Sequence, residues 1–203
     1  MMSYIEIPKI NCTLPIYHGT EGITHITPRD IAYAKVMGRQ IKLLATSKTE
    51  GETLSALVAP FLVGPKHPLY NVTDVFNAIF VHGNVLGDAM FYGSGAGKLP
   101  TASAVVSDVV DAAKHLHRNI MTMWEEDKLI LADIGFTMRR FFVRMSGKRE
   151  DYEAKILDDF GDVEWIDAGF EDEFGFITEL MSENHYRNHA HNYDNVLGRI
   201  RMI

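Results

Sequence analysis

The first hundred residues alternate short apolar segments with turn residues, a pattern that predicts mainly β-strands. Residues 40–48 (QIKLLATSK) and 53–63 (TLSALVAPFLV) are expected to form strands, and the second is apolar enough to lie at the centre of a sheet. Two more strands are expected in NAIFVHG and LGDAMFYG, on either side of a short turn near Gly83 and Asn84.

Two helices are predicted in the same part of the chain. The first lies in THITPRDIAYAKVMGRQ, where Thr27 suits the N-cap, Pro28 the first helical position and Asp30 the electropositive first turn. Gly38 suits the end of this helix. The second helix is expected over about residues 101–117, in a segment rich in alanine and valine, and close alanine–valine packing is expected to keep it ordered.

Beyond residue 119 the pattern becomes that of a compact second unit. A strand (RRFFVRMSG), a helix (REDYEAKILDDFG) and two strands (DVEWIDAGF and GFITELMS) precede HYRNHAHNYDNVLGRIRMI, which suits a helix with room for a final strand. This order is ferredoxin-like, the arrangement of small ACT regulatory modules. We place the boundary between about Ile120 and Met138, and the predicted fold class is α+β.

Composition and charge narrow the classes of function. The 203 residues suffice for one domain or two small ones, and 46% hydrophobic with 23% charged residues is ordinary globular composition. The net charge of −7 argues against a nucleic-acid partner. No apolar run is long enough for a membrane span, and the first residues lack a signal-peptide pattern. With Cys12 as the single cysteine, a cytoplasmic location is expected.

The segment GSGAGKLPTASAVVSD, which runs from residue 93 to residue 108, is the clearest candidate for a binding site. Gly93, Gly95 and Gly97 allow close approach of another group to the backbone. Thr101 suits the cap of the following helix, whose first-turn N–H groups would form an anion site. The alternative is structural, because a strand-to-helix turn needs glycine in any case. The spacing matches neither a Walker loop nor the usual dinucleotide fingerprint.

This segment, together with EGITHITPRDIAYAKVMGRQIKLLA and HPLYNVTDVFNAIFVHGNVLGDAMFYG, resembles the C-terminal half of bacterial homoserine dehydrogenase over about residues 21–203. The resemblance implies a homoserine dehydrogenase-type mixed sheet, with the catalytic and dimerisation domain over residues 21–125 and an ACT-like regulatory domain over residues 138–203. It further implies oxidation of homoserine to aspartate semialdehyde with NAD(P), in the biosynthesis of threonine and methionine. A homodimer is expected, because the apolar strands over residues 53–61 and 77–92 would otherwise leave an open, uncovered sheet.

The same resemblance assigns the glycine segment to the coenzyme. In homoserine dehydrogenases this loop lies against the nicotinamide cofactor, so Gly93, Gly95, Gly97 and Thr101 are the candidate cofactor-binding residues. The catalytic lysine and carboxylates of the family lie upstream of the segment that matches GITHI, and no such segment occurs in these 203 residues. No catalytic residue is therefore assigned, and the chain alone is expected to be inactive.

Residues 4–21 carry a second resemblance. The segment YIEIPKINCTLPIYHGTE is similar to an early strand region of class C sortases, the transpeptidases that link pilins. The catalytic residues of a sortase lie well beyond such a segment, and Cys12 does not match the nucleophile. We expect residues 1–20 to be a strand segment joined to the rest by gene rearrangement or misassembly; chance similarity is the alternative.

Two clusters raise the question of a metal site. In HYRNHAH, His185 and His189 have the i, i+4 spacing that two ligands on a helix require, but no cysteine or carboxylate completes the set, which favours an exposed helix face. The acidic run FEDEFG lacks the alternation of a calcium loop and suits a hairpin turn. No metal site is predicted.

The second unit raises the question of an effector. ACT units that bind one usually carry an Asp-x-Pro-Gly turn after the first strand, whereas this chain has SGKREDYE, so threonine binding is doubtful and a structural or dimer-forming unit is an equal alternative. The alternation of Phe141, Val143 and Met145 with Arg140, Phe142 and Arg144 predicts a half-buried strand rather than a basic ligand patch.

Three hypotheses of function follow. The first is part of an NAD(P)-dependent homoserine dehydrogenase that lacks the nucleotide-binding domain. The second is a non-enzymatic dimerisation or regulatory module that binds an amino acid or a partner chain. The third, a sortase-related surface protein, rests on the first twenty residues alone.

Overall fold

The computed structural model describes residues 2–3, 19–118 and 130–203. The sortase-like segment, apart from its last few residues, and most of the connector before residue 138 lie outside the described residues. The described residues form four α-helices, two short 3-10 helices and eleven strands, in this order: β1(Met2–Ser3) α1(Pro28–Val36) β2(Gln40–Glu50) β3(Thr53–Val63) η2(Pro68–Asn71) β4(Phe76–Gly83) β5(Gly87–Ser94) α2(Lys98–Lys114) β6(Ile130–Leu131) η3(Ile134–Phe136) β7(Met138–Ser146) α3(Arg149–Phe160) β8(Glu164–Ile166) β9(Glu173–Ile177) β10(Met181–Ser182) α4(Glu183–Ala190) β11(Val196–Met202). None of the described helices is long and apolar enough to span a membrane.

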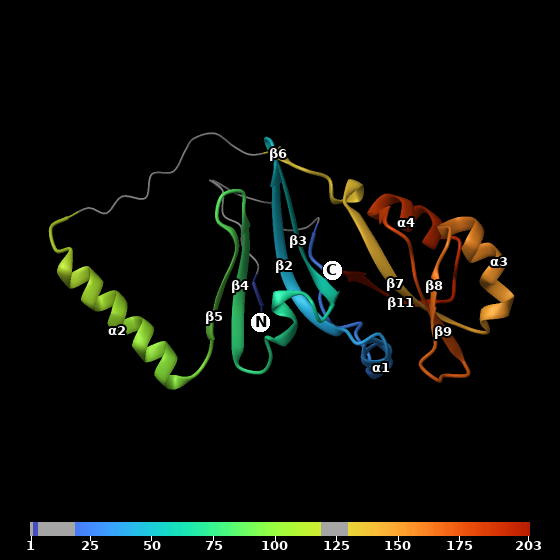
Figure 1. The fold of residues 1–203 in the computed structure, drawn as a ribbon, viewed down its shortest axis with the longest axis horizontal. Helices are drawn as coiled ribbons and strands as arrows, with labels where there is room; N and C mark the ends of the chain where they lie inside the picture. The colour runs from blue at the N-terminus through green and yellow to red at the C-terminus, as the bar shows by residue number, and fades with distance from the viewer. Residues whose placement is uncertain (1, 4–18, 119–129) are drawn as a thin grey trace.

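A single mixed sheet runs through most of the molecule. Its strand order is β1-β2-β3-β11-β7-β9-β8, with β6 paired to β3 and β10 paired to β7. Figure 1 shows this sheet between α3 and α4 at one end and the β4–β5 hairpin with α2 at the other. The two strands predicted for residues 40–48 and 53–63 are confirmed, and the second is central because it pairs on both edges.

The second unit has the split βαβ topology that its order of elements predicts. Strands β11, β7, β9 and β8 are neighbours in that order, and each pair is antiparallel. Helices α3 and α4 cover one face, where Phe141, Val143 and Phe176 form the core of this unit with Ile156 and Tyr186. The topology is ferredoxin-like; that the unit is an ACT regulatory module stays a prediction.

The first helix is capped as its sequence predicts. The Thr27 side chain accepts a hydrogen bond from the backbone of Asp30, and the Asp30 carboxylate accepts one from the backbone N–H of Thr27 at 2.7 Å, a reciprocal capping box. Gly38, with φ +63°, follows the C-cap. This helix covers the sheet face opposite α3 and α4, where Tyr33 packs on Phe142 with ring centroids 5.2 Å apart.

Strand β7 corrects the prediction of a half-buried strand. All five residues from Phe141 to Met145 are buried, because α3 and α4 cover one face and α1 covers the other. Arg144 is therefore buried, and its Nε lies 3.1 Å from Asp30 Oδ1 and its Nη1 3.2 Å from Glu173 Oε2. A buried guanidinium needs such partners. The acidic run is a turn only in part, since Glu173 begins β9.

The edge of β3 that faces away from β2 is shared by three segments far apart in sequence. Strand β6 pairs with Thr53 and Leu54, Thr20 forms a bridge with Val58, and β11 pairs with Phe61 and Leu62. This edge therefore joins the split βαβ unit to the rest of the sheet.

Candidate functional site

The glycine segment connects β5 of the hairpin to helix α2. Every residue from Phe91 to Asp111 is exposed, so the segment and the helix stand away from the sheet. Figure 1 shows α2 at the end of the molecule farthest from α3. The loop can thus meet a ligand or another protein surface without any rearrangement of the described chain.

The three glycines are required for different reasons. Gly97 is the N-cap of α2 and has φ +127°, a conformation that residues with a side chain rarely adopt. At Gly95 an added Cβ would lie 1.4 Å from Nδ2 of Asn77, so that side chain would have to move. Gly93 has neither a positive φ nor any atom within 4 Å of an added Cβ. Its lack of a side chain has no structural reason in the described chain.

Thr101 does not cap the helix, which corrects the prediction. Helix α2 begins at Lys98, three residues earlier than expected, because Gly97 makes the turn. The Thr101 N–H donates to the Gly97 carbonyl at 3.1 Å and is already used within the helix. Since Pro100 has no N–H, only Lys98 and Leu99 leave backbone donors free for an anion in the first turn.

Helix α2 has an apolar stripe that the described chain leaves uncovered. Val105, Val106, Val109 and Val110 lie three to four residues apart and are 45–63% exposed. No residue of α2 is buried, so the expectation that alanine–valine packing orders this helix is wrong for the described chain. The hairpin carries a further exposed apolar side chain, because Phe91 is 67% exposed.

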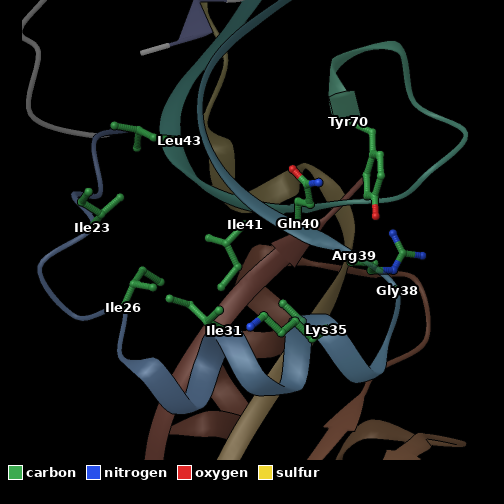
Figure 2. Close-up of a pocket in the computed structure, with 11 residues that line it drawn as sticks. Ile23, Ile26, Ile31, Lys35, Gly38, Arg39, Gln40, Ile41, Leu43 and Tyr70 are labelled. Carbon is green, nitrogen blue, oxygen red and sulfur yellow. The ribbon is translucent and has the colours of Figure 1, made fainter. Parts of the chain in front are cut away.

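A second uncovered surface is a pocket of about 690 Å³ between α1 and β2. Figure 2 shows the aliphatic side chains of Ile23, Ile26 and Ile31 gathered around Ile41, with Arg39 and Tyr70 at the other end. The pocket forms because α1 covers only part of this face of β2. Its walls are mostly apolar, and Ile23 and Ile31 remain about half exposed.

The ionisable groups of the described residues include a lysine on β2 and a histidine on α4 that pairs with a carboxylate. Burial lowers the pKa of Lys42, whose Nζ donates to the Val72 carbonyl at 2.5 Å. His185 and His189 of HYRNHAH lie on α4, His191 is its C-cap, and His189 Nδ1 is 3.0 Å from the Asp159 carboxylate. Among residues 2–3, 19–118 and 130–203, no group of three or more potential metal ligands comes together.

Sequence reasoning missed Asn77 as the neighbour of Gly95 and missed the pocket in Figure 2. The first could have been found, because a turn at Gly83 places Asn77 directly opposite Gly93 in the hairpin register. The second depends on how much of β2 is covered by α1, which sequence pattern does not reveal.

Comparison with known proteins gives a consistent result. Residues 16–110 match the family model for homoserine dehydrogenase. A homoserine dehydrogenase of Corynebacterium glutamicum is 43% identical over 132 residues, which cover 62% of this chain and 30% of that protein. The enzyme of Bacillus subtilis is 40% identical over 100 residues, 49% of this chain and 23% of that protein.

Solved structures extend the match beyond residue 110. The homoserine dehydrogenase from Thiobacillus denitrificans superposes with a TM-score of 0.73 at 27% identity, covering 90% of this chain and 47% of that one. A structure of the Staphylococcus aureus enzyme at pH 6.5 gives a TM-score of 0.71 at 26% identity, with 95% and 49% coverage. The chain is homologous to homoserine dehydrogenase and spans about half or less of the relatives it matches.

Proposed function

We propose that this chain is the part of an NAD(P)-dependent homoserine dehydrogenase that carries the mixed sheet, the coenzyme-facing glycine loop and an ACT-like unit. The observation that carries the proposal is the homology, which extends over 90% of this chain but 47% of the solved Thiobacillus denitrificans chain. Homoserine oxidation then depends on a nucleotide-binding part that these 203 residues do not include, whether it belongs to the same polypeptide or to another.

The glycine segment fits a role against the coenzyme. Gly93, Gly95 and Gly97 would let the backbone approach it, and the free N–H groups of Lys98 and Leu99 suit an anionic or carbonyl oxygen. Bound NAD(P) supplies the hydride acceptor. Gly93 supports this role most directly. A Cβ added at this position would point into open space, so nothing in the described chain requires glycine there. A bound coenzyme would supply the missing reason.

The two uncovered apolar surfaces are, in this proposal, where the remainder of the enzyme packs. The pocket of Figure 2 offers isoleucine side chains that a further helix or strand could bury. The α2 stripe offers a row of valines to a second domain. Burying such surface stabilises an assembly by about 25 cal/mol per Å² of apolar area.

Complementation tests the proposal. The 203-residue chain, mixed with the part of the Corynebacterium glutamicum enzyme that its match leaves out, should give homoserine-dependent reduction of NAD(P), and the chain alone should give none. Ile31→Asp in the pocket should abolish this activity. Leu180→Asp, at an exposed residue outside both surfaces, should leave it unchanged.

Two results would contradict the proposal. Activity of the isolated chain would refute its dependence on a second part. A lack of activity both from the mixture and from a single fused chain would refute the function itself.

We further propose that the chain forms a homodimer. The exposed apolar side chains of Ile79 on β4 and Phe91 on β5, which lie opposite one another in the hairpin, would otherwise leave one face of it in water. Sedimentation at micromolar concentration should show a dimer, and Phe91→Glu should convert it to a monomer. Finding only monomer for the unaltered chain would contradict the proposal.

A regulatory module without enzymatic activity is the second candidate function, favoured by the complete core of the split βαβ unit. Its helix α3 follows a turn at Gly147 with φ +109°, but Glu150 and Asp151 occupy the first helical turn. Their negative charge opposes the carboxylate of an amino-acid effector at this end. We therefore propose a role in assembly for this unit rather than threonine binding.

A further inference from the structure

A polar pocket of about 440 Å³ lies between the tip of the β4–β5 hairpin and the start of β7. Four strands build its walls and contribute Thr46 and Lys48 from β2, Ser55 from β3, His82 from β4 and Arg139 from β7. Hydroxyl, ammonium and guanidinium groups all donate hydrogen bonds. None of the residues that line this pocket is aspartate or glutamate. It therefore suits a ligand rich in acceptor oxygens.

Arg139 brings a charge to this pocket that is only partly compensated. Its side chain is 19% exposed, and its guanidinium lies over the Phe61 ring, 5.1 Å from the centroid. Its Nε is buried and has no hydrogen-bond partner among the described residues. The nearest carboxylate oxygen, Oε1 of Glu183, is 3.9 Å from that Nε, beyond hydrogen-bond range.

Glu183 compensates Arg139 only in part, because two other arginines hold it at shorter distances. Its Oε2 accepts from Arg201 Nη2 at 2.8 Å and from Arg199 Nη1 at 3.1 Å. The same two arginines donate to Glu21 at 2.7 Å. Three guanidinium groups thus face two carboxylates in this cluster, and the surplus positive charge falls on Arg139.

The basic residues at the rim are paired differently. Lys48 Nζ lies 2.5 Å from Glu50 and His82 Nδ1 lies 2.5 Å from Asp88, and all four side chains are more than half exposed. Exposed pairs of this kind are weak and exchange readily with solvent. The preference for an anion therefore comes from Arg139, and the rim residues can turn toward a ligand without disturbing the fold.

We propose that this pocket binds the oxyanion group, carboxylate or phosphate, of a small polar metabolite. Arg139 would donate to two oxygens at once, the arrangement that makes arginine selective for oxyanions. The hydroxyls of Thr46 and Ser55 donate to the carbonyls of Leu57 and Lys48 at 3.4 and 3.3 Å, and they would turn from these long hydrogen bonds to orient the rest of the ligand. The volume lies within the range of small-molecule sites. This inference goes beyond the proposed function, because it needs only residues of this chain.

NMR titration of the 203-residue chain tests the site with two probes, inorganic phosphate and succinate. Saturable shifts of the Thr46, Ser55 and Arg139 N–H signals are expected with at least one of them. Arg139→Gln should weaken binding about tenfold or more, since hydrogen bonds to charged groups are the strong ones. Lys66→Gln removes the same charge at an exposed site and should change nothing. The probe that binds more tightly identifies the oxyanion.

Absence of saturable shifts with both probes at millimolar concentration would overturn the proposal, as would equal affinities for Arg139→Gln and the unaltered chain. Thermal unfolding checks that the variant is folded. If it is not, the double variant Thr46→Val and Ser55→Ala must show the loss of binding instead. None of these readouts requires homoserine oxidation, so a failure here is distinguishable from a failure of the proposed function.

Discussion

The split βαβ unit and the hairpin with α2 differ in how much of their apolar surface the rest of the chain buries. In the split unit, Phe141, Val143 and Phe176 are at most 1% exposed. In the hairpin and α2, Leu86, Phe91 and Leu99 are 67–79% exposed, and α2 buries no residue at all. Both regions have well-formed secondary structure with suitable turns.

Local sequence signals and tertiary burial are therefore separate sources of order in this chain. Turn chemistry and strand pairing define the local structure of the hairpin. A two-stranded hairpin is marginal in water without a covered apolar face, and here, among the described residues, only Ala78 and Phe80 of β4 pack against the sheet core. We therefore expect the stability of this chain to come from the sheet and the split unit. The hairpin and α2 provide surface for something else.

The largest effect should come from the core of the split unit. Phe176→Ala removes a fully buried ring and should lower the free energy of unfolding by about 4 kcal/mol, the range for Phe→Ala in a core. Phe91→Ala, at an exposed position on β5, should lower it by less than about 0.5 kcal/mol. Urea unfolding followed by circular dichroism measures both.

Equal losses of unfolding free energy in Phe176→Ala and Phe91→Ala would contradict this contrast between the two regions. A loss of stability in Phe91→Ala that appears only at high protein concentration would mean that a second copy of the chain covers the hairpin.

A smaller effect should follow from acid. Burial alone would raise the pKa of Glu21, but hydrogen bonds and charge from Arg201 and Arg199 outweigh it and lower the pKa from 4.5 to about 2. A carboxylate whose pKa is lower in the folded than in the unfolded state stabilises the fold above pH 4.5. This contribution is lost as the pH falls toward 2. We expect about 1 kcal/mol, because Glu21 is 39% exposed and solvent screens the pair.

Glu21→Gln should remove this part of the pH dependence, measured as the urea midpoint between pH 5 and pH 2. Glu171→Gln removes an equal charge at an exposed site and should keep it. If the urea midpoint of Glu21→Gln falls between pH 5 and pH 2 as steeply as that of the unaltered chain, this cluster does not stabilise the junction between β3 and the split unit.

The smallest effects distinguish the glycines. Gly97→Ala should cost about 1 kcal/mol, because φ +127° is strained for alanine. Gly93→Ala should leave the melting temperature of the free chain within about 1 °C, since its Cβ meets nothing. In the completed enzyme, however, Gly93→Ala should raise the KM for NAD(P) several-fold.

Gly95→Ala lies between these two variants, because Asn77 must rotate to admit the new methyl group. A large loss of stability in Gly93→Ala with unaltered coenzyme affinity would return the loop to a purely structural role.

Sequence pattern predicted the elements of this fold better than their burial. The capping box of Thr27 and Asp30 is local, so it could be identified from four residues. The hairpin around Gly83 followed from its turn and its alternation. The burial of Arg144 could not be predicted, because its partner Asp30 lies on a helix more than a hundred residues earlier.

The sequence predicted where the candidate site lies along the chain but not how each of its residues is used. Gly95 and Gly97 do form an exposed strand-to-helix turn, and Gly93 precedes it at the end of β5. Thr101 lost its expected role because the left-handed conformation of Gly97 starts the helix one turn sooner, and backbone dihedrals of glycine cannot be inferred from sequence. Their contact with a coenzyme stays a prediction.

The shared edge of β3 has a consequence for how the chain folds. Phe61 and Leu62 stay unpaired on that edge until β11, far along the chain, has been synthesised and has turned back alongside them. Contacts of such long sequence separation slow folding, and an open apolar strand edge is a template for aggregation while it waits. Slow refolding should therefore be a property of this molecule.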